Sequence, residues 1–152
     1  MSVYQEAKGS PILKGVIVVL LGILLYVLYE PYQIREQEET FRRESRARMT
    51  NIRQAQLLYI SEHNQYASNL DTLVAFIKTR PDSVLQVLSR PLVLTSFVPE
   101  SLLLAPKSGR PYRLTSVDTT VIKKYLLEDP DGYGSIGSLT DDTRVNKATW
   151  EE

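Results

Sequence analysis

The chain contains no cysteine and a single histidine, His63. The lack of cysteine excludes disulfides, thiolate metal sites, iron–sulfur clusters and cysteine nucleophiles, and one histidine does not make a histidine-rich metal site. Basic and acidic residues number 18 each, so no overall positive field attracts nucleic acid, and we expect no nucleic-acid partner. A length of 152 residues suits one ordinary domain and excludes a multidomain enzyme.

Charge is also scarce in residues 12–29, which read ILKGVIVVLLGILLYVLY with Lys14 as their only charge. At about 1.5 Å per residue this segment spans roughly 27 Å, which is just enough for a transmembrane helix. The residues that follow it are bulky, with no A-x-A-like cleavage site, so we expect a permanent anchor in the lipid bilayer. A buried core helix is the alternative, but one small domain could hardly enclose such a run.

The flanking charges favour one orientation of this single-pass anchor. Lys14 lies at the edge of the membrane segment, whereas glutamates dominate the first stretch beyond it. We therefore expect residues 1–11 in the cytoplasm and the rest of the chain outside it, in the periplasm if the membrane is a bacterial inner membrane.

The segment from residue 33 to residue 64 has no glycine or proline and has a helix-favouring composition. Its first part is highly charged, and we predict that residues 30–48 form a helical stalk. Its second part has an apolar face, which predicts that a small head, residues 49–152, packs against it. That face consists of Met49, Ile52, Ala55 and Tyr59, and Ile60 could extend it.

The rest of the chain predicts an α+β head. Asn64 is a good C-cap for the long helix, and a second helix should start at Ser68 or Asn69 and end near Arg80. Later runs rich in β-branched and aromatic residues, broken by proline and glycine, suggest a short antiparallel sheet, with one more short strand in the tail. The strand candidates are residues 92–98, 112–117 and 120–127, and residues 84–88 could form either a helix or a strand.

Glycines at 132, 134 and 137 match the G-x-G-x-x-G fingerprint of dinucleotide sites. That fingerprint requires a following helix and an acidic residue about twenty positions later, and only fifteen residues remain. We therefore interpret the pattern as a loop that needs positive φ angles.

The same region partly matches a calcium-binding loop. Asp129 and Asp131 occupy its first and third positions, but Tyr133 and Thr140 stand where further ligands belong. Two more carboxylates, those of Asp141 and Asp142, could fold back and complete a non-standard site. The alternative is that these aspartates are solvated or paired with basic neighbours, and we expect no other metal or cofactor.

Five arginines follow the acidic start of the stalk: Arg42, Arg43, Arg46, Arg48 and Arg53. They could form i, i+4 pairs with glutamates on a solvated face, contact the acidic stretches 36–39 or 128–131 of a neighbouring molecule, or meet anionic lipid or nucleic acid. Together with Ile34 and Phe41 they make up our candidate partner interface. No nucleophile, base and orienting group can be assembled from the sequence, and His63 sits at a helix end, so we expect no enzymatic activity.

The stretch around the end of the long helix resembles type IV pilins and the pseudopilins of type II secretion. In those proteins a helix ends in a Y-x-x-x-N-x-x-Y-P-like stretch before a leucine-bearing second helix. The matching residues here are Tyr59, Asn64, Tyr66, Leu70 and Leu73. The P-K-S-G-R-P-Y stretch at residues 106–112 is similar to the turn that leads into the sheet of those heads.

The chain departs from that family at the processing signal. Pilins have a cleavage glycine with a glutamate at the fifth following position, whereas Gly9 and Gly15 are followed at that position by Lys14 and Leu20. Ala67 also replaces the proline of the motif. The resemblance implies a non-enzymatic structural subunit of a secretion or pilus-type envelope assembly, and the departures imply that its anchor is permanent.

Two other functions remain open at this point. The chain could be a coiled-coil scaffold or accessory subunit of another membrane complex, or a membrane-tethered calcium- or ligand-binding module. For the envelope subunit and for the scaffold we expect other membrane proteins as partners, bound through the membrane helix and the stalk, in a homo- or hetero-oligomer.

Overall fold

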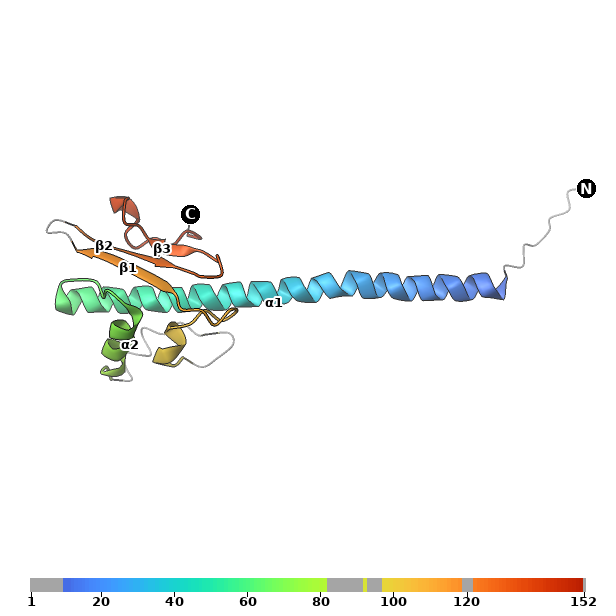
Figure 1. The fold of residues 1–152 in the computed structure, drawn as a ribbon, viewed down its shortest axis with the longest axis horizontal. Coiled ribbons are helices and arrows are strands. Elements are labelled where there is room, and N and C mark those ends of the chain that lie inside the picture. Colours follow the sequence, from blue (N-terminus) through green and yellow to red (C-terminus); the bar gives the residue numbers. More distant parts are fainter. Residues whose placement is uncertain (1–9, 82–91, 93–96, 119–121, 152) are drawn as a thin grey trace, which may run out of the picture. The chain divides into compact units, whose positions relative to one another are not determined.

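The computed structural model describes residues 10–81, 92, 97–118 and 122–151 (Figure 1). The chain divides into two compact units, Met1–Glu39 and Thr40–Glu152, and the second is called the head below. Helix α1, Pro11–His63, contributes to both units. The helix does not break at Pro31, where a kink is the usual consequence of a proline.

In the first unit the apolar side chains of α1 are exposed along residues 12–29. An 18-residue window of the helix has a mean hydropathy of 2.5, and none of it is buried. It is the one helix in the described parts of the chain that is long and apolar enough to cross a membrane.

Helix α1 ends where the sequence predicts. Asn64 follows the last helical residue, His63, and has a φ of 54°, the left-handed conformation that terminates helices. Helix α2, Leu70–Lys78, then starts with Asn69 as its N-cap, because the Asn69 side chain accepts a hydrogen bond of 2.8 Å from the backbone N–H of Thr72. Both predicted helix boundaries are confirmed.

The sheet has three antiparallel strands in the order β1–β2–β3: β1, Arg113–Asp118; β2, Lys123–Glu128; and β3, Ser135–Gly137. Leu127 in the central strand lies opposite Leu114 on one side and Ile136 on the other. The predicted small antiparallel sheet is therefore confirmed, including the short strand in the tail. Of the first strand candidate, residues 93–96 lie outside the described residues, as do residues 84–88, while Phe97 and Val98 form no strand.

The core of the head forms between the second part of α1, α2 and the sheet. Its most deeply buried apolar side chains are Met49, Ile52, Leu73, Ile77, Leu102, Tyr125, Leu127 and Ile136. The predicted apolar face of α1 is thus part of the core. Two 3₁₀ helices complete the described part of the head, η1, Pro99–Leu102, and η2, Asp142–Arg144.

The head starts earlier than residue 49. The compact unit begins at Thr40, and within it Glu44 and Ser45 are fully buried. The end of the predicted stalk therefore belongs to the head, because polar side chains of residues 44–48 find hydrogen-bond partners there and tolerate burial.

Candidate functional site

The arginine-rich part of α1 is the candidate site, and Arg48 lies inside the head. Arg48 forms an ion pair of 3.0 Å with Glu44, one helical turn earlier, and both side chains are buried. Its Nη1 also donates to the carbonyl oxygens of Ser101, at 3.0 Å, and Leu104, at 2.8 Å. Arg48 thus joins α1 to the η1 region, which corrects its assignment to an exposed partner interface. Its charge is tolerated because a carboxylate and two carbonyls surround it.

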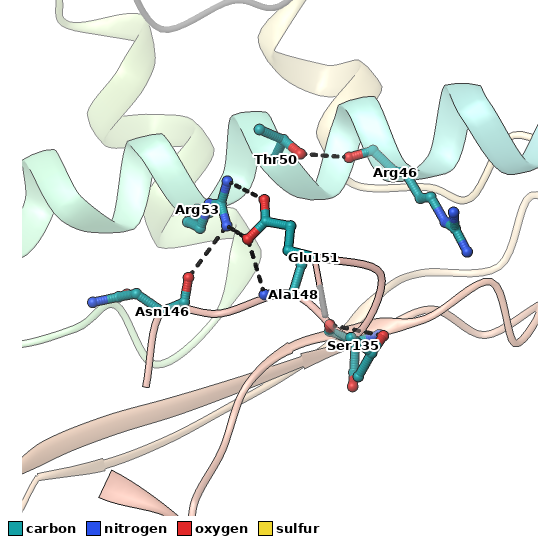
Figure 2. Close-up of polar contacts among 8 residues, drawn as sticks. Arg46, Thr50, Arg53, Ser135, Asn146, Ala148 and Glu151 are labelled. Atoms are coloured by element: carbon teal, nitrogen blue, oxygen red, sulfur yellow. Dashed lines mark hydrogen bonds and ion pairs between the residues drawn. The ribbon is translucent and has the colours of Figure 1, made fainter. Parts of the chain in front are cut away.

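Two further arginines of α1 contact later parts of the head. Figure 2 shows Arg53 bound to Glu151 and Asn146 of the C-terminal segment, residues 146–151. Arg53 donates to both carboxylate oxygens of Glu151, at 2.8 and 2.9 Å, and to the carbonyl of Asn146 at 3.2 Å. Arg46 donates to the carbonyl of Tyr133, and its guanidinium lies 5.1 Å from the centre of the Trp150 ring. Arg46 and Arg53 are therefore bound within the head. This differs from the expectation that they belong to an interface with a partner.

Arg42 and Arg43 differ from these three arginines in that they make no contact of this kind within the described parts of the head. Both are exposed, and neither has a hydrogen bond or ion pair with any residue that the structure describes. The i, i+4 pairs that the sequence allows to Glu38 and Glu39 are not formed. Of the two apolar members of the predicted interface, Ile34 is 61% exposed and Phe41 is half-buried. These four residues remain available for contact with a partner.

Asp129 is part of a buried polar chain. The Ser45 hydroxyl donates to Oδ2 of Asp129, and the Tyr112 hydroxyl, 2.7 Å from the Ser45 oxygen, donates to Ser45 in turn. The backbone N–H of Asp131 donates to the other Asp129 oxygen at 2.6 Å. Burial raises the pKa of Tyr112 well above its ordinary value, so this phenol stays protonated and remains a donor. This series of hydrogen bonds joins the loop after β2 to α1.

The other aspartates of the predicted calcium site have partners of their own. Asp131 accepts from the backbone N–H of Ser108 and pairs with Arg110 at 3.0 Å. Burial alone would raise the pKa of Asp131, but the hydrogen bonds from Ser108 and Arg110 outweigh it and the pKa is lowered.

Asp141, the N-cap of η2, accepts from the backbone N–H of Thr143 at 2.9 Å, and Asp142 pairs with Lys124. Within the described residues, no three side chains of His, Cys, Asp or Glu come close enough to hold a metal ion. The structure therefore does not gather the four aspartates, because Asp129 follows the end of β2, whereas Asp142 pairs with Lys124 near the start of that strand. Pairing with basic neighbours, the alternative interpretation, describes Asp131 and Asp142.

No family model, curated protein or solved structure matches this chain. The site is therefore interpreted from its own geometry.

The glycine-rich loop and His63 are the remaining candidates from the sequence, and the structure gives each a local structural role. Gly132, Gly134 and Gly137 have φ angles of 80°, 142° and 87°, which confirms a loop that needs positive φ. The His63 ring stacks on Tyr59 with 4.2 Å between centroids, at the end of α1.

Sequence reasoning missed the Ser45–Tyr112–Asp129 chain. A serine between two charged residues carries no signal of burial, whereas the i, i+4 spacing of Glu44 and Arg48 could have revealed that pair.

Proposed function

We propose that this chain is a non-enzymatic, single-pass membrane-anchored structural subunit of a secretion or pilus-type envelope assembly. The observation that carries the proposal is the use of α1 in two ways. None of its apolar first part is buried, while the face from Met49 to Tyr59 is buried under the sheet and α2. An exposed apolar helix of this length favours lipid or other membrane helices as its surroundings.

The residues that carry the resemblance to pilins have local structural roles consistent with it. Tyr66 packs on Tyr125 of the central strand, with 4.7 Å between ring centroids, just after Asn64 ends α1. Leu70 and Leu73 are buried from α2. This helix end leads directly into α2, whose leucines join the core of the head, as expected for a pilin-like head, and this supports the proposal.

The proposed subunit differs from a typical pilin in its anchor. Lys14 or Leu20 stands where the processed family has a glutamate, so we expect the N-terminus to stay uncleaved and the helix to remain in the membrane. The orientation with residues 1–11 in the cytoplasm and the head outside it belongs to the same proposal.

The decisive experiment is affinity purification of the full-length protein from gently solubilised native membranes. Mass spectrometry of the co-purifying proteins and of the intact N-terminus should identify secretion or pilus components and an unprocessed chain. Co-purification with an unrelated membrane complex alone would replace the proposal with an accessory subunit. A strictly monomeric protein with no crosslinked partner in native membranes would remove its basis.

A coiled-coil scaffold is the second candidate, because Ile34 lies beyond the membrane segment and is nevertheless 61% exposed. Ile34 and Phe41 are seven residues apart, the spacing of one heptad. Substitution of Ile34 by aspartate distinguishes the two functions: a scaffold loses its partner, whereas a subunit held through its membrane helix and head keeps most of its assembly.

A further inference from the structure

The outer edge of β1 has backbone groups without hydrogen-bond partners. Among the described strands only β2 pairs with β1, which lies at one edge of the sheet. Just before β1, the backbone N–H of Tyr112 points away from β2 and donates to the carbonyl of Leu103 at 3.2 Å. Backbone groups alternate sides along a strand, so those of Leu114 and Ser116 point to the same open side. Neither has a backbone partner there among the residues that the structure describes.

An apolar groove lies beside this edge. It has a volume of about 340 Å³, and its walls come from the start of α2, the segment after η1 and the start of β1. Leu104 in this lining is 46% exposed, so an apolar side chain faces water there. The groove can therefore receive apolar side chains from a segment that lies along β1. Its apolar lining consists of Leu70, Leu103, Leu104, Pro111, Tyr112 and Leu114.

The rim of the groove carries a carboxylate without a counter-charge. Asp71 lines the groove from the first turn of α2, and its side chain is exposed. It has no hydrogen bond or ion pair with any residue in the described parts of the chain. An apolar groove with a negative rim favours a ligand that combines apolar side chains with a positive one.

We propose that β1 accepts an extended segment of a partner protein as an additional strand. The segment bonds to the free backbone groups of Leu114 and Ser116, places alternate apolar side chains in the groove and brings a lysine or arginine to Asp71. Backbone hydrogen bonds supply affinity in this mode of binding, and the groove supplies selectivity. All of these residues belong to the head, so the inference goes beyond the proposed function and does not depend on the membrane anchor.

Amide exchange in the full-length protein, in mild detergent, tests the location of the site. The probe is a capped peptide, T-V-T-L-T-K, whose valine, leucine and lysine share one face when it is extended. Without peptide, the amides of Leu114 and Ser116 should exchange quickly, whereas that of Thr115, which faces β2, should exchange slowly. About 1 mM peptide should slow the first two roughly tenfold.

Two results of this measurement would overturn the inference. One is unchanged exchange of Leu114 and Ser116 when the peptide is added. The other is slow exchange of both amides without peptide, because the edge would then already be covered by this chain. If that protection rises with protein concentration, the occupant is a second copy and the assignment to a partner protein is wrong.

Substitutions test each part of the site through the affinity of the labelled peptide. Ser116→Pro removes an edge donor without touching the bonds to β2, so the affinity should fall roughly tenfold. Asp71→Asn should weaken binding of T-V-T-L-T-K roughly threefold and leave that of T-V-T-L-T-Q unchanged. Leu104→Ser should weaken the binding of both peptides. The matched control is Leu57→Ser, at a leucine of α1 that is 37% exposed and lies outside the groove.

The two side-chain variants keep the inference testable if Ser116→Pro does not fold. Natural affinity in both Asp71→Asn and Leu104→Ser would overturn it, as would equal losses in Leu104→Ser and Leu57→Ser. Such a failure leaves the proposed function in place, because co-purification of the anchored protein with secretion or pilus components tests that function separately.

Discussion

Arg53 and Glu151 are ninety-eight positions apart in the sequence and form a two-pronged ion pair in the head, with N–O distances of 2.8 and 2.9 Å. The Arg53 side chain is only 12% exposed, whereas that of Glu151 is 43% exposed. The hydrogen bonds to Glu151 raise the pKa of Arg53, so the guanidinium stays charged. The pair closes the C-terminal segment onto α1 (Figure 2).

Glu151→Gln should lower the free energy of unfolding of the head by about 1–2 kcal/mol, because a mostly buried guanidinium loses its charged partner. Arg53→Ala should cost at least as much. Thermal or denaturant unfolding of the full-length protein in mild detergent measures both. Ser61→Ala is the matched control, since this exposed serine on α1 bonds only to a nearby backbone carbonyl. Equal stability of all three variants would show that the Arg53–Glu151 ion pair contributes nothing to the free energy of unfolding.

Gly137 and Gly109 form a matched pair of glycines with positive φ angles, 87° and 65°. A Cβ added at Gly137 would lie 2.2 Å from the Tyr125 carbonyl oxygen, while nothing lies within 4 Å of one added at Gly109. We expect Gly109→Ala to cost about 1 kcal/mol from the backbone conformation alone. Gly137→Ala should cost about 2–4 kcal/mol because the central strand must shift. The same unfolding measurement checks both, and equal losses would contradict the steric argument.

The sequence predicts the local features of this fold well. Asn64 at the end of α1, Asn69 at the start of α2 and the two strands that contain Leu114 and Leu127 all follow from rules that involve a few neighbouring residues. Helix caps and periodic apolar faces depend on short-range chemistry, so they can be read without a structure.

The arginines show where such prediction fails. Charge normally indicates an exposed side chain, yet Arg48 is buried because Glu44 and two carbonyls from the η1 region meet it. Arg53 finds its partner at the far end of the chain. Only the folded arrangement separates these residues from Arg42 and Arg43, which the same sequence pattern groups together.

Asp131 should make the head sensitive to acid. Its pKa is lowered in the folded protein, so the unfolded chain binds its proton first as the pH falls. Its stabilising contribution is therefore complete above about pH 4 and is lost as the pH falls through the folded-state pKa. Asp131→Asn should give a shallower loss of stability below about pH 4 than the natural protein.

Unfolding curves at several pH values test this. Some pH dependence should remain, because the hydrogen bond from Thr143 also lowers the pKa of Asp141. Asp118→Asn, at an exposed aspartate at the end of β1, is the control. If the Asp131→Asn protein has the same acid profile as the natural one, Asp131 is not a source of the acid sensitivity.

The apolar segment of α1, residues 12–29, should tolerate few charges if it spans the membrane as proposed. An arginine near the centre of a spanning helix costs about 2.5–3.5 kcal/mol of insertion free energy. The double variant Leu20→Arg, Leu21→Arg should therefore be released from membranes by alkaline washing, while the natural protein is retained. Tyr32→Arg, outside the apolar run and 67% exposed, should behave like the natural protein. Retention of the double variant would argue against a spanning segment.

The orientation of the chain can be read from two single cysteines. With the N-terminus in the cytoplasm and the head outside, Ser61→Cys should react with a membrane-impermeant maleimide on intact spheroplasts. Ser2→Cys should react only after permeabilisation. Ser61 is exposed on α1, so a lack of labelling there would not result from burial. The reverse pattern would place Lys14 outside the cytoplasm and the head inside it, against the orientation that the flanking charges favour. A head in the cytoplasm would remove the basis for an envelope assembly outside it.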